Sequence, residues 1–503
     1  MAYRIYPVCR TEEVCGDYTV KVNGVPAELN TARVSRIPFN RRWPGHQRDI
    51  SQSELVNFLS LATDEPLTLE ITPAKPFETV TVRPLSANIK HEITPNGKIL
   101  VRVDHPQYFT VEPYGRAHAL HVFVDPMPQY DVDPQDENVL YFGAGEHEVG
   151  QIELHSNQTL YLDEGAVVYA TIRAKDAKNV RILGRGILDV SHTKEQILFE
   201  AHEENNHSAV KNAKRTHTIW LEYCDNVEID GITIRDSLVY NIRPLACRHL
   251  RIKNVKIIGC WRFNSDGIDM HNCEDVLIEN CFLRTFDDSI CVKGFDCYYK
   301  GDVEAAVQAA MHRNGQNYES FRNVLVRRCV IWNDWGRCLE IGAETRAEEI
   351  CDICFEDCDI IHVMHAVLDA QNVDYADVHD IVWKNIRIEL DDVIPQPVIQ
   401  RTDAQEYTQN DPDYTPPLLC SVVAYHHEYS AGGERRGKNR DLRFEDIYIT
   451  GRQKPRFSFK GYSADAMSER ITLKNIFHNG RKLESLGECT LEMNAFCRDI
   501  QLI

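Results

Sequence analysis

Residues 226–232 read Asn-Val-Glu-Ile-Asp-Gly-Ile, and variants of this pattern recur along the chain. Two close copies are residues 249–255, His-Leu-Arg-Ile-Lys-Asn-Val, and residues 275–281, Asp-Val-Leu-Ile-Glu-Asn-Cys. Each copy alternates apolar and polar residues, as a short β-strand does, and then reaches a small polar turn. Further copies begin at residues 323, 352, 380, 441 and 470. Short strands repeated at this period predict a parallel β-helix, a solenoid in which each coil buries its apolar row against its neighbours.

The repeat also explains much of the chain's content of 17 cysteines. Aligning the copies gives one apolar column, made of Ile232, Val255, Cys281, Cys329, Cys358, Ile386, Ile447 and Ile476. Cysteine alternates there with Val and Ile, so we interpret it as a small core residue. A metal site built from Cys351, Cys354 and Cys358 is the alternative, but the register turns Cys354 and Cys358 in opposite directions, whereas zinc needs converging ligands. We therefore predict neither a metal site nor a cofactor.

Residues 1–130 have a different sequence pattern: apolar and polar residues alternate in short strands, but the repeat of the coils is missing. The clearest of these strands are residues 18–24, 67–71, 79–82, 99–103 and 120–124. Such a set favours a β-sandwich. We predict an all-β chain with an N-terminal β-sandwich domain over residues 1–130, a polar linker near 125–137, and a β-helix domain over residues 131–503.

Three insertions interrupt the coils, at residues 296–322, 391–420 and 426–440. The first contains a predicted helix over residues 302–312. Long loops on a rigid scaffold often carry binding sites, so we expect these insertions near one edge of the solenoid, where they would form a lid.

The overall charge limits the partners. A formal net charge of −20 argues against nucleic acids and anionic membrane surfaces, because both require basic patches. No apolar run is long enough to span a membrane, and the first residues lack the apolar stretch of a secretory signal. Together with the odd number of cysteines, this predicts a cytoplasmic location. Formation of a homo-oligomer is left open.

Three carboxylates, those of Asp266, Asp287 and Asp288, occur in two short segments, residues 264–267 (Asn-Ser-Asp-Gly) and residues 286–288 (Phe-Asp-Asp). Asp287 and Asp288 follow Asp266 by about one coil, so the three side chains can meet. Clustered carboxylates cannot all stay ionised without cost, and a shared site separates their pKa values. A protonated acid beside charged partners is what cleavage of a glycosidic bond requires.

The strands that follow these segments also align with later coils. In this alignment Asp266, Asp288, Arg337 and His365 form one row, with Asp287 beside it. A row of ionisable side chains on a solenoid face is typical of a functional site. The candidate catalytic residues are therefore Asp266, Asp287 and Asp288.

These motifs make the chain similar to glycoside hydrolase family 28, the polygalacturonases and rhamnogalacturonases, and more loosely to the family 49 dextranases. Residues 264–267 resemble the Asn-Thr-Asp-Gly motif of family 28, and residues 286–288 resemble its Gly-Asp-Asp or Gln-Asp-Asp motif. The resemblance implies a right-handed, pectin-lyase-like β-helix and an inverting mechanism. It also implies that Asp287 is the general acid and that Asp266 and Asp288 hold and activate the water.

Two departures from the family pattern concern the substrate. Arg337 replaces the histidine of the Gly-His-Gly motif, and residues 368–370, Leu-Asp-Ala, stand where Arg-Ile-Lys would hold a substrate carboxylate. A neutral sugar is the simpler inference. By the alternation of the strand, Asp369 is predicted to point inward. The candidate substrate-binding residues are Asn264, Asp269, Lys293, Arg337, Glu340 and His365.

The sequence thus predicts an inverting, exo-acting glycoside hydrolase of a neutral or weakly charged oligosaccharide. One alternative is a polygalacturonase-type hydrolase of pectin oligosaccharides. Another is a β-helix polysaccharide lyase or a transglycosylase, where a lyase would need a cation such as calcium and a base such as Arg337 or Lys293. The third is a non-catalytic, glycan-binding solenoid.

Overall fold

The computed structural model describes residues 3–9, 13–36, 53–192, 216–262, 264–295, 303–390, 417–427, 430 and 435–503. Most of insertion 391–420 and part of insertion 426–440 lie outside the described residues, so the expected lid is not tested there. The described part of the first insertion contains the predicted helix, α3 (Val303–Met311). No helix of the described residues is long and apolar enough to cross a membrane.

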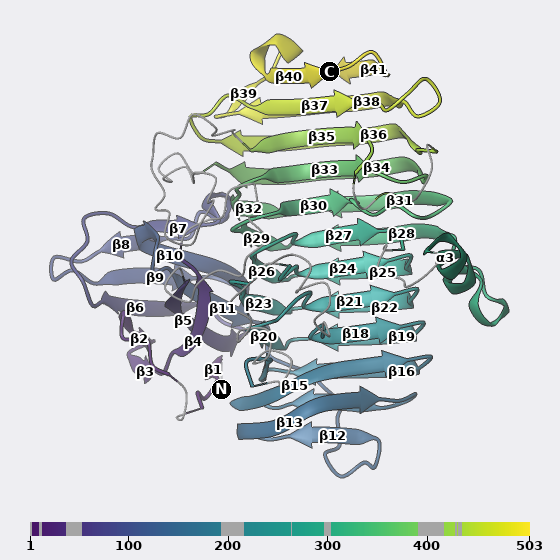
Figure 1. Cartoon of the computed structure of the whole chain (residues 1–503). Coiled ribbons are helices and arrows are strands. Elements are labelled where there is room, and N and C mark those ends of the chain that lie inside the picture. The colour runs from purple at the N-terminus through teal and green to yellow at the C-terminus, as the bar shows by residue number, and fades with distance from the viewer. Residues whose placement is uncertain are drawn as a thin grey trace, which may run out of the picture.

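The N-terminal part contains two β-sheets (Figure 1), and their inward-facing residues form one apolar core. One sheet contains β1 (Tyr3–Ile5), β4 (Asn30–Ser35), β5 (Ser53–Thr63), β7 (Thr81–Arg83), β10 (Gln107–Arg116) and β11 (Leu120–Asp125). The other contains β2 (Tyr18–Val22), β3 (Val25–Ala27), β6 (Leu67–Pro73), β8 (His91–Ile93) and β9 (Ile99–Val103). A short 3₁₀ helix, η2, spans Leu85–Ala87. The predicted β-sandwich is therefore present.

The rest of the chain is a right-handed parallel β-helix, as predicted, with three strands in most coils. We call first face the sheet made of β15 (Ala166–Lys175), β18 (Ile219–Glu222), β21 (Ile242–Leu245), β24 (Ile268–His271), β27 (Ile290–Lys293), β30 (Arg337–Ile341), β33 (Ala366–Asn372), β35 (Leu418–Ala424), β37 (Arg456–Lys460) and β40 (Thr490–Met493).

The second face contains the repeated sequence pattern. Its strands are β12 (Val139–Phe142), β14 (Thr159–Leu162), β16 (Lys178–Gly184), β19 (Asp225–Asp230), β22 (Arg248–Lys253), β25 (Glu274–Glu279), β28 (Ser320–Arg327), β31 (Glu349–Glu356), β34 (Asp377–Glu389), β36 (Lys438–Thr450), β38 (Ser468–His478) and β41 (Cys497–Leu502). The third face contains β17 (Ile187–Asp189), β20 (Thr233–Arg235), β23 (Lys256–Gly259), β26 (Phe282–Thr285), β29 (Val330–Asn333) and β32 (Asp359–His362). The remaining elements are β13 (Gly145–Leu154), β39 (Arg481–Lys482), η3 (Arg313–Gly315) and η4 (Leu486–Glu488).

The first position of the repeat has a conformational role. In all eight copies this residue has a positive φ, between 52° and 60°, at Asn226, His249, Asp275, Asn323, Asp352, Asp380, Asp441 and Arg470. Asn and Asp tolerate this left-handed conformation better than most residues. The first residue of each repeat therefore supplies a left-handed bend near the start of a second-face strand.

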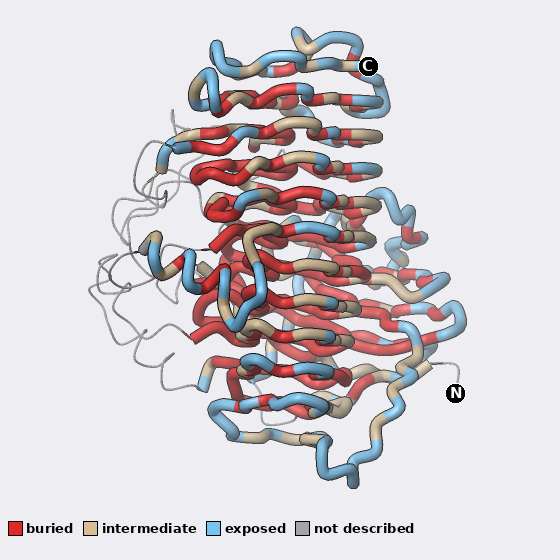
Figure 2. Tube along the Cα trace, turned by 90° about the vertical axis from the view of Figure 1, so that its right-hand side faces the viewer, coloured by how far each residue is buried: buried red, intermediate tan, exposed pale blue. Residues whose placement is uncertain are grey.

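The apolar column of the repeat is buried throughout. All eight of its residues, including Cys281, Cys329 and Cys358, belong to the solenoid core and are at most 1% exposed. Figure 2 shows buried residues along the inside of the stacked coils and exposed residues mainly at their turns. The prediction that these cysteines act as core residues is confirmed.

The sandwich packs against the third face through both apolar and charged side chains. Phe58 and Phe123 of the sandwich join one apolar cluster with Phe282 and Trp332 of the solenoid. Asp125, which lies at the start of the predicted linker, is completely buried at the end of β11. It accepts hydrogen bonds from Lys256 Nζ at 3.1 and 3.2 Å, and Arg185 Nε lies 3.5 Å away. These contacts fix the sandwich to the coils that precede the candidate site.

Candidate active site

Three of the predicted site residues form a row at the beginning of strands of the first face. The pairing of Ile268 with Ile290, and of Ile290 with Leu339, places Asp266, Asp288 and Arg337 at equivalent positions. The next coil differs from the prediction, because Arg337 pairs with Ala366 and not with His365. The cause is the run Ala366-Val367-Leu368, in which consecutive apolar residues do not define which of them faces the core.

The three aspartates meet in a buried cluster. One carboxylate oxygen of each lies within 4.8 Å of the others, and all three residues are buried. Asp287 Oδ2 accepts a hydrogen bond from the backbone N–H of Asn264 at 3.2 Å. Asp288 Oδ1 accepts one from the backbone N–H of Arg337 at 2.9 Å. Asn264 therefore positions the cluster through its backbone, which is a different contribution from the predicted substrate contact.

Two glycines allow these segments to approach so closely. A Cβ added to Gly267 would lie 2.3 Å from the backbone oxygen of Ser289. Gly336 has a φ of +91°, and a Cβ there would lie 2.8 Å from Asp288 Oδ1. Glycine is required at both positions because the site leaves no room for a side chain.

Lys293 is the central cation of the cluster. Its Nζ lies 2.8 Å from Asp269, 3.5 Å from Asp266, 3.7 Å from Asp288 and 3.8 Å from Glu344. The sequence predicted Asp269 and Lys293 as site residues but missed Glu344, which lies in a connection outside the strand pattern.

Arg337 connects the cluster to the following coils. Its Nε lies 3.0 Å from Asp369 and 3.5 Å from Glu340, and its Nη1 lies 3.7 Å from Asp288. The prediction that Asp369 points inward is wrong. The strand register pairs Asp369 with Glu340, so both side chains lie on the outer side of the first face, with Arg337.

The environment separates the pKa values of the three aspartates. Burial, followed by repulsion from Asp288, raises the pKa of Asp287 well above its ordinary value. Burial, followed by repulsion from Asp269 and Asp287, does the same to the pKa of Asp266. Burial also acts to raise the pKa of Asp288, but attraction to Lys293 and Arg337 outweighs it and the pKa is lowered. The cluster thus favours the neutral form of Asp287 and of Asp266 and the charged form of Asp288.

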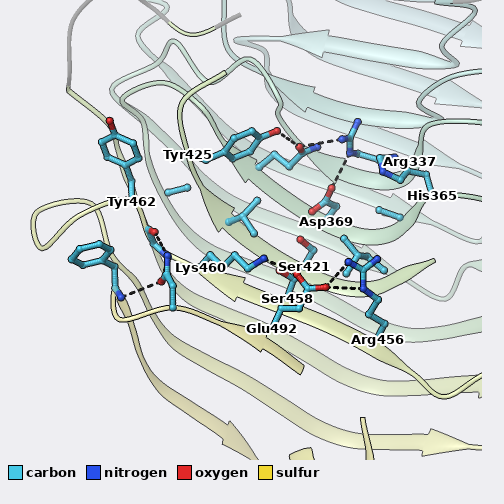
Figure 3. A pocket seen from close by; sticks show the side chains of 18 residues that line it. Arg337, His365, Asp369, Ser421, Tyr425, Arg456, Ser458, Lys460, Tyr462 and Glu492 are labelled. Atoms are coloured by element: carbon cyan, nitrogen blue, oxygen red, sulfur yellow. Dashed lines mark hydrogen bonds and ion pairs between the residues drawn. The ribbon is translucent and has the colours of Figure 1, made fainter. Parts of the chain in front are cut away.

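A cavity of about 600 Å³ opens on the first face beyond Arg337, toward the C-terminal coils (Figure 3). Arg337, Asp369 and Gln371 line one end, together with His365, which is thus close to the site although outside the row. The sequence reading missed the other residues that line the cavity, which include Ser421, Tyr425, Arg456, Ser458, Lys460 and Glu492.

The middle of the chain matches a known family. Residues 144–417, more than half of the chain, match the family described as Glycosyl hydrolases family 28. The chain belongs to glycosyl hydrolase family 28. The resemblance inferred from the aspartate motifs is thereby confirmed.

Similarity to individual family 28 proteins is partial. A "Probable polygalacturonase" of Vitis vinifera is 28% identical over 184 residues, which cover 32% of this chain and 38% of that protein. A "Polygalacturonase" of Brassica napus is 30% identical over 89 residues, or 18% of this chain and 22% of that protein. The matched segments therefore cover less than half of these relatives.

One solved structure resembles nearly the whole chain. Dex49A from Penicillium minioluteum aligns with a TM-score of 0.53 and 13% identity, and the alignment covers 97% of this chain and 94% of that one. At this identity the likeness concerns the fold alone. The aligned region includes the N-terminal sheets as well as the β-helix, to which the family 28 match over residues 144–417 belongs.

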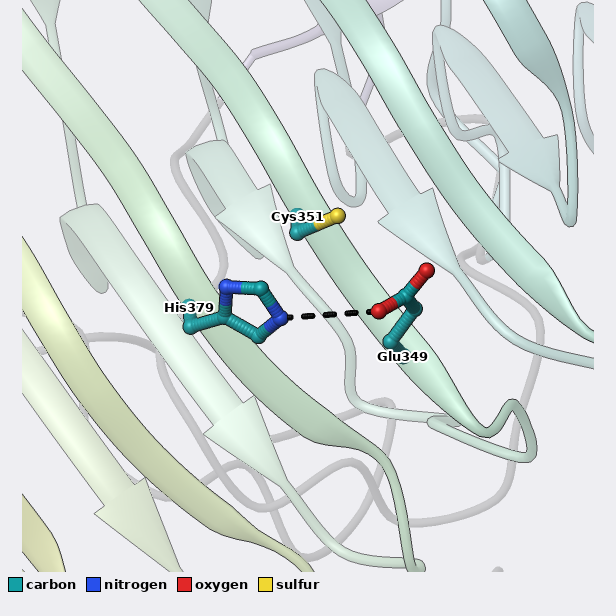
Figure 4. Close-up of side chains that lie close together, drawn as sticks. All are labelled: Glu349, Cys351 and His379. Carbon is teal, nitrogen blue, oxygen red and sulfur yellow. Dashed lines mark ion pairs between the residues drawn. The ribbon is translucent and has the colours of Figure 1, made fainter.

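A second group of possible metal ligands lies on the second face, away from the carboxylate cluster. Glu349, Cys351 and His379 have ligand atoms within 4.8 Å of one another (Figure 4), and His379 Nε2 lies 3.7 Å from Glu349. Cys351 is the only residue of the alternative cysteine site that takes part. The strand register places Arg322 and Arg440 on either side of the Cys351–His379 pair, and these positive charges disfavour a bound cation.

Proposed function

We propose that this protein hydrolyses a glycosidic bond in a neutral or weakly charged oligosaccharide, with Asp287 as general acid and Asp288 as general base. One observation carries the assignment of roles. Lys293 and the side chain and backbone of Arg337 all contact Asp288, whereas the two largest influences on Asp287 are burial and repulsion from Asp288. The cations favour the charged form of Asp288. They attract Asp287 as well, but burial and repulsion from Asp288 outweigh this attraction and favour the neutral form of Asp287.

In the proposed reaction, Asp287 gives its proton to the glycosidic oxygen as the bond to the sugar carbon breaks. A water molecule held by Asp288 and Asp266 attacks that carbon and loses its proton to Asp288. Carboxylate oxygens up to 4.8 Å apart can share one water, because each hydrogen bond needs about 2.7–2.8 Å. Asp287 ends as a carboxylate and Asp288 as a carboxylic acid, and solvent exchange restores both.

We expect inversion of the anomeric carbon, as the family resemblance implies. The separation of the carboxylates is shorter than the roughly 6.5–9.5 Å common among inverting enzymes and is closer to the roughly 5–5.5 Å of retaining ones. In a retaining enzyme Asp288 would instead attack the sugar directly. The anomer of the released sugar therefore tests the proposed mechanism.

The charge around the site supports an uncharged substrate. Seven buried carboxyl groups surround two cations, Lys293 and Arg337, and they belong to Asp266, Asp269, Asp287, Asp288, Glu340, Glu344 and Asp369. Both cations already contact carboxylates. A uronate would bring one more negative charge into this cluster, which is unfavourable in a buried site.

A polygalacturonase-type activity on pectin oligosaccharides is the second candidate, favoured by the relatives in Vitis vinifera and Brassica napus. A lyase is less well supported. Burial acts to lower the pKa of Lys293, but Asp269 and Glu344 outweigh it and the pKa is raised, so this lysine is a poor base. Exo action and a cytoplasmic location remain part of the proposal.

A screen of aryl glycosides and short oligosaccharides distinguishes these functions. We expect release of reducing sugar from at least one neutral substrate, unchanged by a chelator. Preferential cleavage of oligogalacturonates would favour the pectin enzyme. An unsaturated product with ultraviolet absorbance, lost in chelator, would favour a lyase. Binding without turnover would favour a glycan-binding solenoid.

A further inference from the structure

The cavity beyond Arg337 arises from two small side chains in one outward-facing column. The strand register aligns Glu340, Asp369, Ser421, Ser458 and Glu492 along β30, β33, β35, β37 and β40. Long side chains stand at both ends of this column, and two serines lie between them. With neighbouring strands about 4.8 Å apart, Asp369 and Glu492 are separated by about 14 Å along the solenoid.

The polar groups of this cavity are paired with one another. Lys460 Nζ donates a hydrogen bond to Glu492 at 2.6 Å, and Arg456 Nε donates one to the same carboxylate at 2.9 Å. At the other end, Arg337 is paired with Asp369 at 3.0 Å. Paired charges can hydrogen-bond sugar hydroxyls as donors and acceptors without requiring a charged ligand.

Aromatic side chains border the same space. Tyr462 and Phe496, which line the cavity, are 37% and 38% exposed, so their rings are accessible at its rim. Tyr425 donates a hydrogen bond to Gln371 Oε1 at 2.5 Å, and Gln371 in turn donates one to Glu340 at 2.7 Å. Ligand sites commonly combine such apolar surfaces with a few fixed polar groups, and about 600 Å³ is within their usual range of roughly 300–1,000 Å³.

We propose that this cavity is a subsite for the uncharged sugar residues that extend from the cleaved bond toward the C-terminal coils, with Lys460 and Glu492 binding their hydroxyls. This inference rests on the proposed glycosidase function and specifies its substrate. Along the solenoid, Ser421 lies three strand spacings, about 14 Å, beyond the coil that contains Asp288. A small aryl leaving group at the cluster would not reach it, so the subsite acts only on longer chains.

The first test measures binding, without any need for turnover. The inactive Asp287→Asn protein is titrated calorimetrically with isomaltotetraose, maltotetraose, nigerotetraose and, as the charged probe, tetragalacturonate. Ser458→Leu fills the hollow, and Lys460→Met removes a donor at the surface of the cavity. Lys454→Ala, at an exposed lysine of the preceding turn, is the matched control, and thermal unfolding confirms that each variant is folded.

We expect saturable binding of at least one neutral tetrasaccharide, weakened at least tenfold by Ser458→Leu and by Lys460→Met but not by Lys454→Ala. Equal affinity in all variants, no binding of any probe, or tighter binding of tetragalacturonate than of every neutral probe would overturn the proposal.

The second test measures turnover. In the active protein, Ser458→Leu should lower kcat/KM at least tenfold on a cleaved tetrasaccharide while changing it less than twofold on an aryl glycoside. Equal effects on both substrates would refute the subsite and leave the glycosidase function intact. Binding that is sensitive to Ser458→Leu in a protein that never releases a reducing end would instead refute the glycosidase function.

Discussion

The ammonium group of Lys293 lies 2.8 Å from Asp269 Oδ2, and both side chains are buried. This pair holds the lysine between Asp266 and Asp288, whose oxygens lie 3.5 and 3.7 Å from it. Lys293 thereby stabilises negative charge on the Asp288 side of the cluster. Burial and repulsion from Asp288 raise the pKa of Asp287, so the cluster favours different protonation states at two adjacent aspartates.

Replacing Lys293 should change the pH dependence of activity. Lys293 and Arg337 lower the pKa of Asp288, so Asp288 stays ionised to lower pH than an ordinary aspartate. In Lys293→Met this pKa should rise, and the acidic limb of kcat/KM should move to higher pH by about one unit. The pH–rate profile measures this shift, with Lys474→Met, at an exposed lysine, as control. An unmoved acidic limb would exclude Asp288 as the base.

Removing the proposed acid should abolish most activity without unfolding the protein. Asp287→Asn keeps the shape of the side chain but cannot donate the proton, so kcat should fall by about 10²–10⁴. Reducing-sugar assays measure kcat, and thermal unfolding monitors the fold. The same change at exposed Asp465 should have no effect. Full activity of Asp287→Asn on every cleaved substrate would assign the acid to another residue.

Alanine substitutions at Gly336 and Gly480, two glycines with positive φ, distinguish the effect of backbone strain from the effect of displacing the aspartate cluster. Their φ values are +91° and +77°, but only at Gly336 would a Cβ meet the cluster, 2.5 Å from the backbone of Asp287. Alanine at Gly480 should cost about 1–2 kcal/mol of unfolding free energy from the left-handed backbone alone, and alanine at Gly336 should cost more because of the added clash. Only Gly336→Ala should also lower kcat, by about 10²-fold. Equal kcat values for the two variants would show that the close approach is unimportant.

The buried contacts of Asp125 should stabilise the whole chain. Burial lowers the pKa of Lys256 to about 8, and Asp125 is the carboxylate that contacts its ammonium group. Asp125→Asn leaves Lys256 and Arg185 without this counter-ion and should lower the unfolding free energy by about 3–5 kcal/mol. Urea unfolding measures the loss, with Asp131→Asn, at an exposed position, as control. A loss below about 1 kcal/mol would mean that these charges find other partners.

The β-helix could be predicted because its coils repeat a local requirement. A left-handed residue lies within the first four residues of each second-face strand that carries the repeat, and the same apolar column follows it, from Asn226 and Ile232 to Arg470 and Ile476. Strand β5 was not predicted, because nearly all of its residues are buried and its sequence lacks the alternation of a strand with one exposed face.

The site could be predicted only where its acidic residues occupy equivalent positions of the sequence repeat. Asp266, Asp287 and Asp288 belong to two successive coils, so their meeting follows from the period. The predicted positions of His365 and Asp369 were wrong by one residue, because the continuous apolar run between them does not define the strand register. The cavity could not be predicted, since Ser421, Ser458 and Glu492 come from three coils and share no motif. Its existence depends on which side chains are small.

The anomer released in the first turnovers is the most direct test of the proposed attack by water. Proton NMR of a cleaved oligosaccharide, recorded before mutarotation, identifies the configuration of the new reducing end. Attack by a water held between Asp288 and Asp266 predicts a product whose configuration is inverted relative to the substrate. A product with retained configuration would contradict this, because it would require a covalent intermediate on one of the carboxylates that we assign to the water.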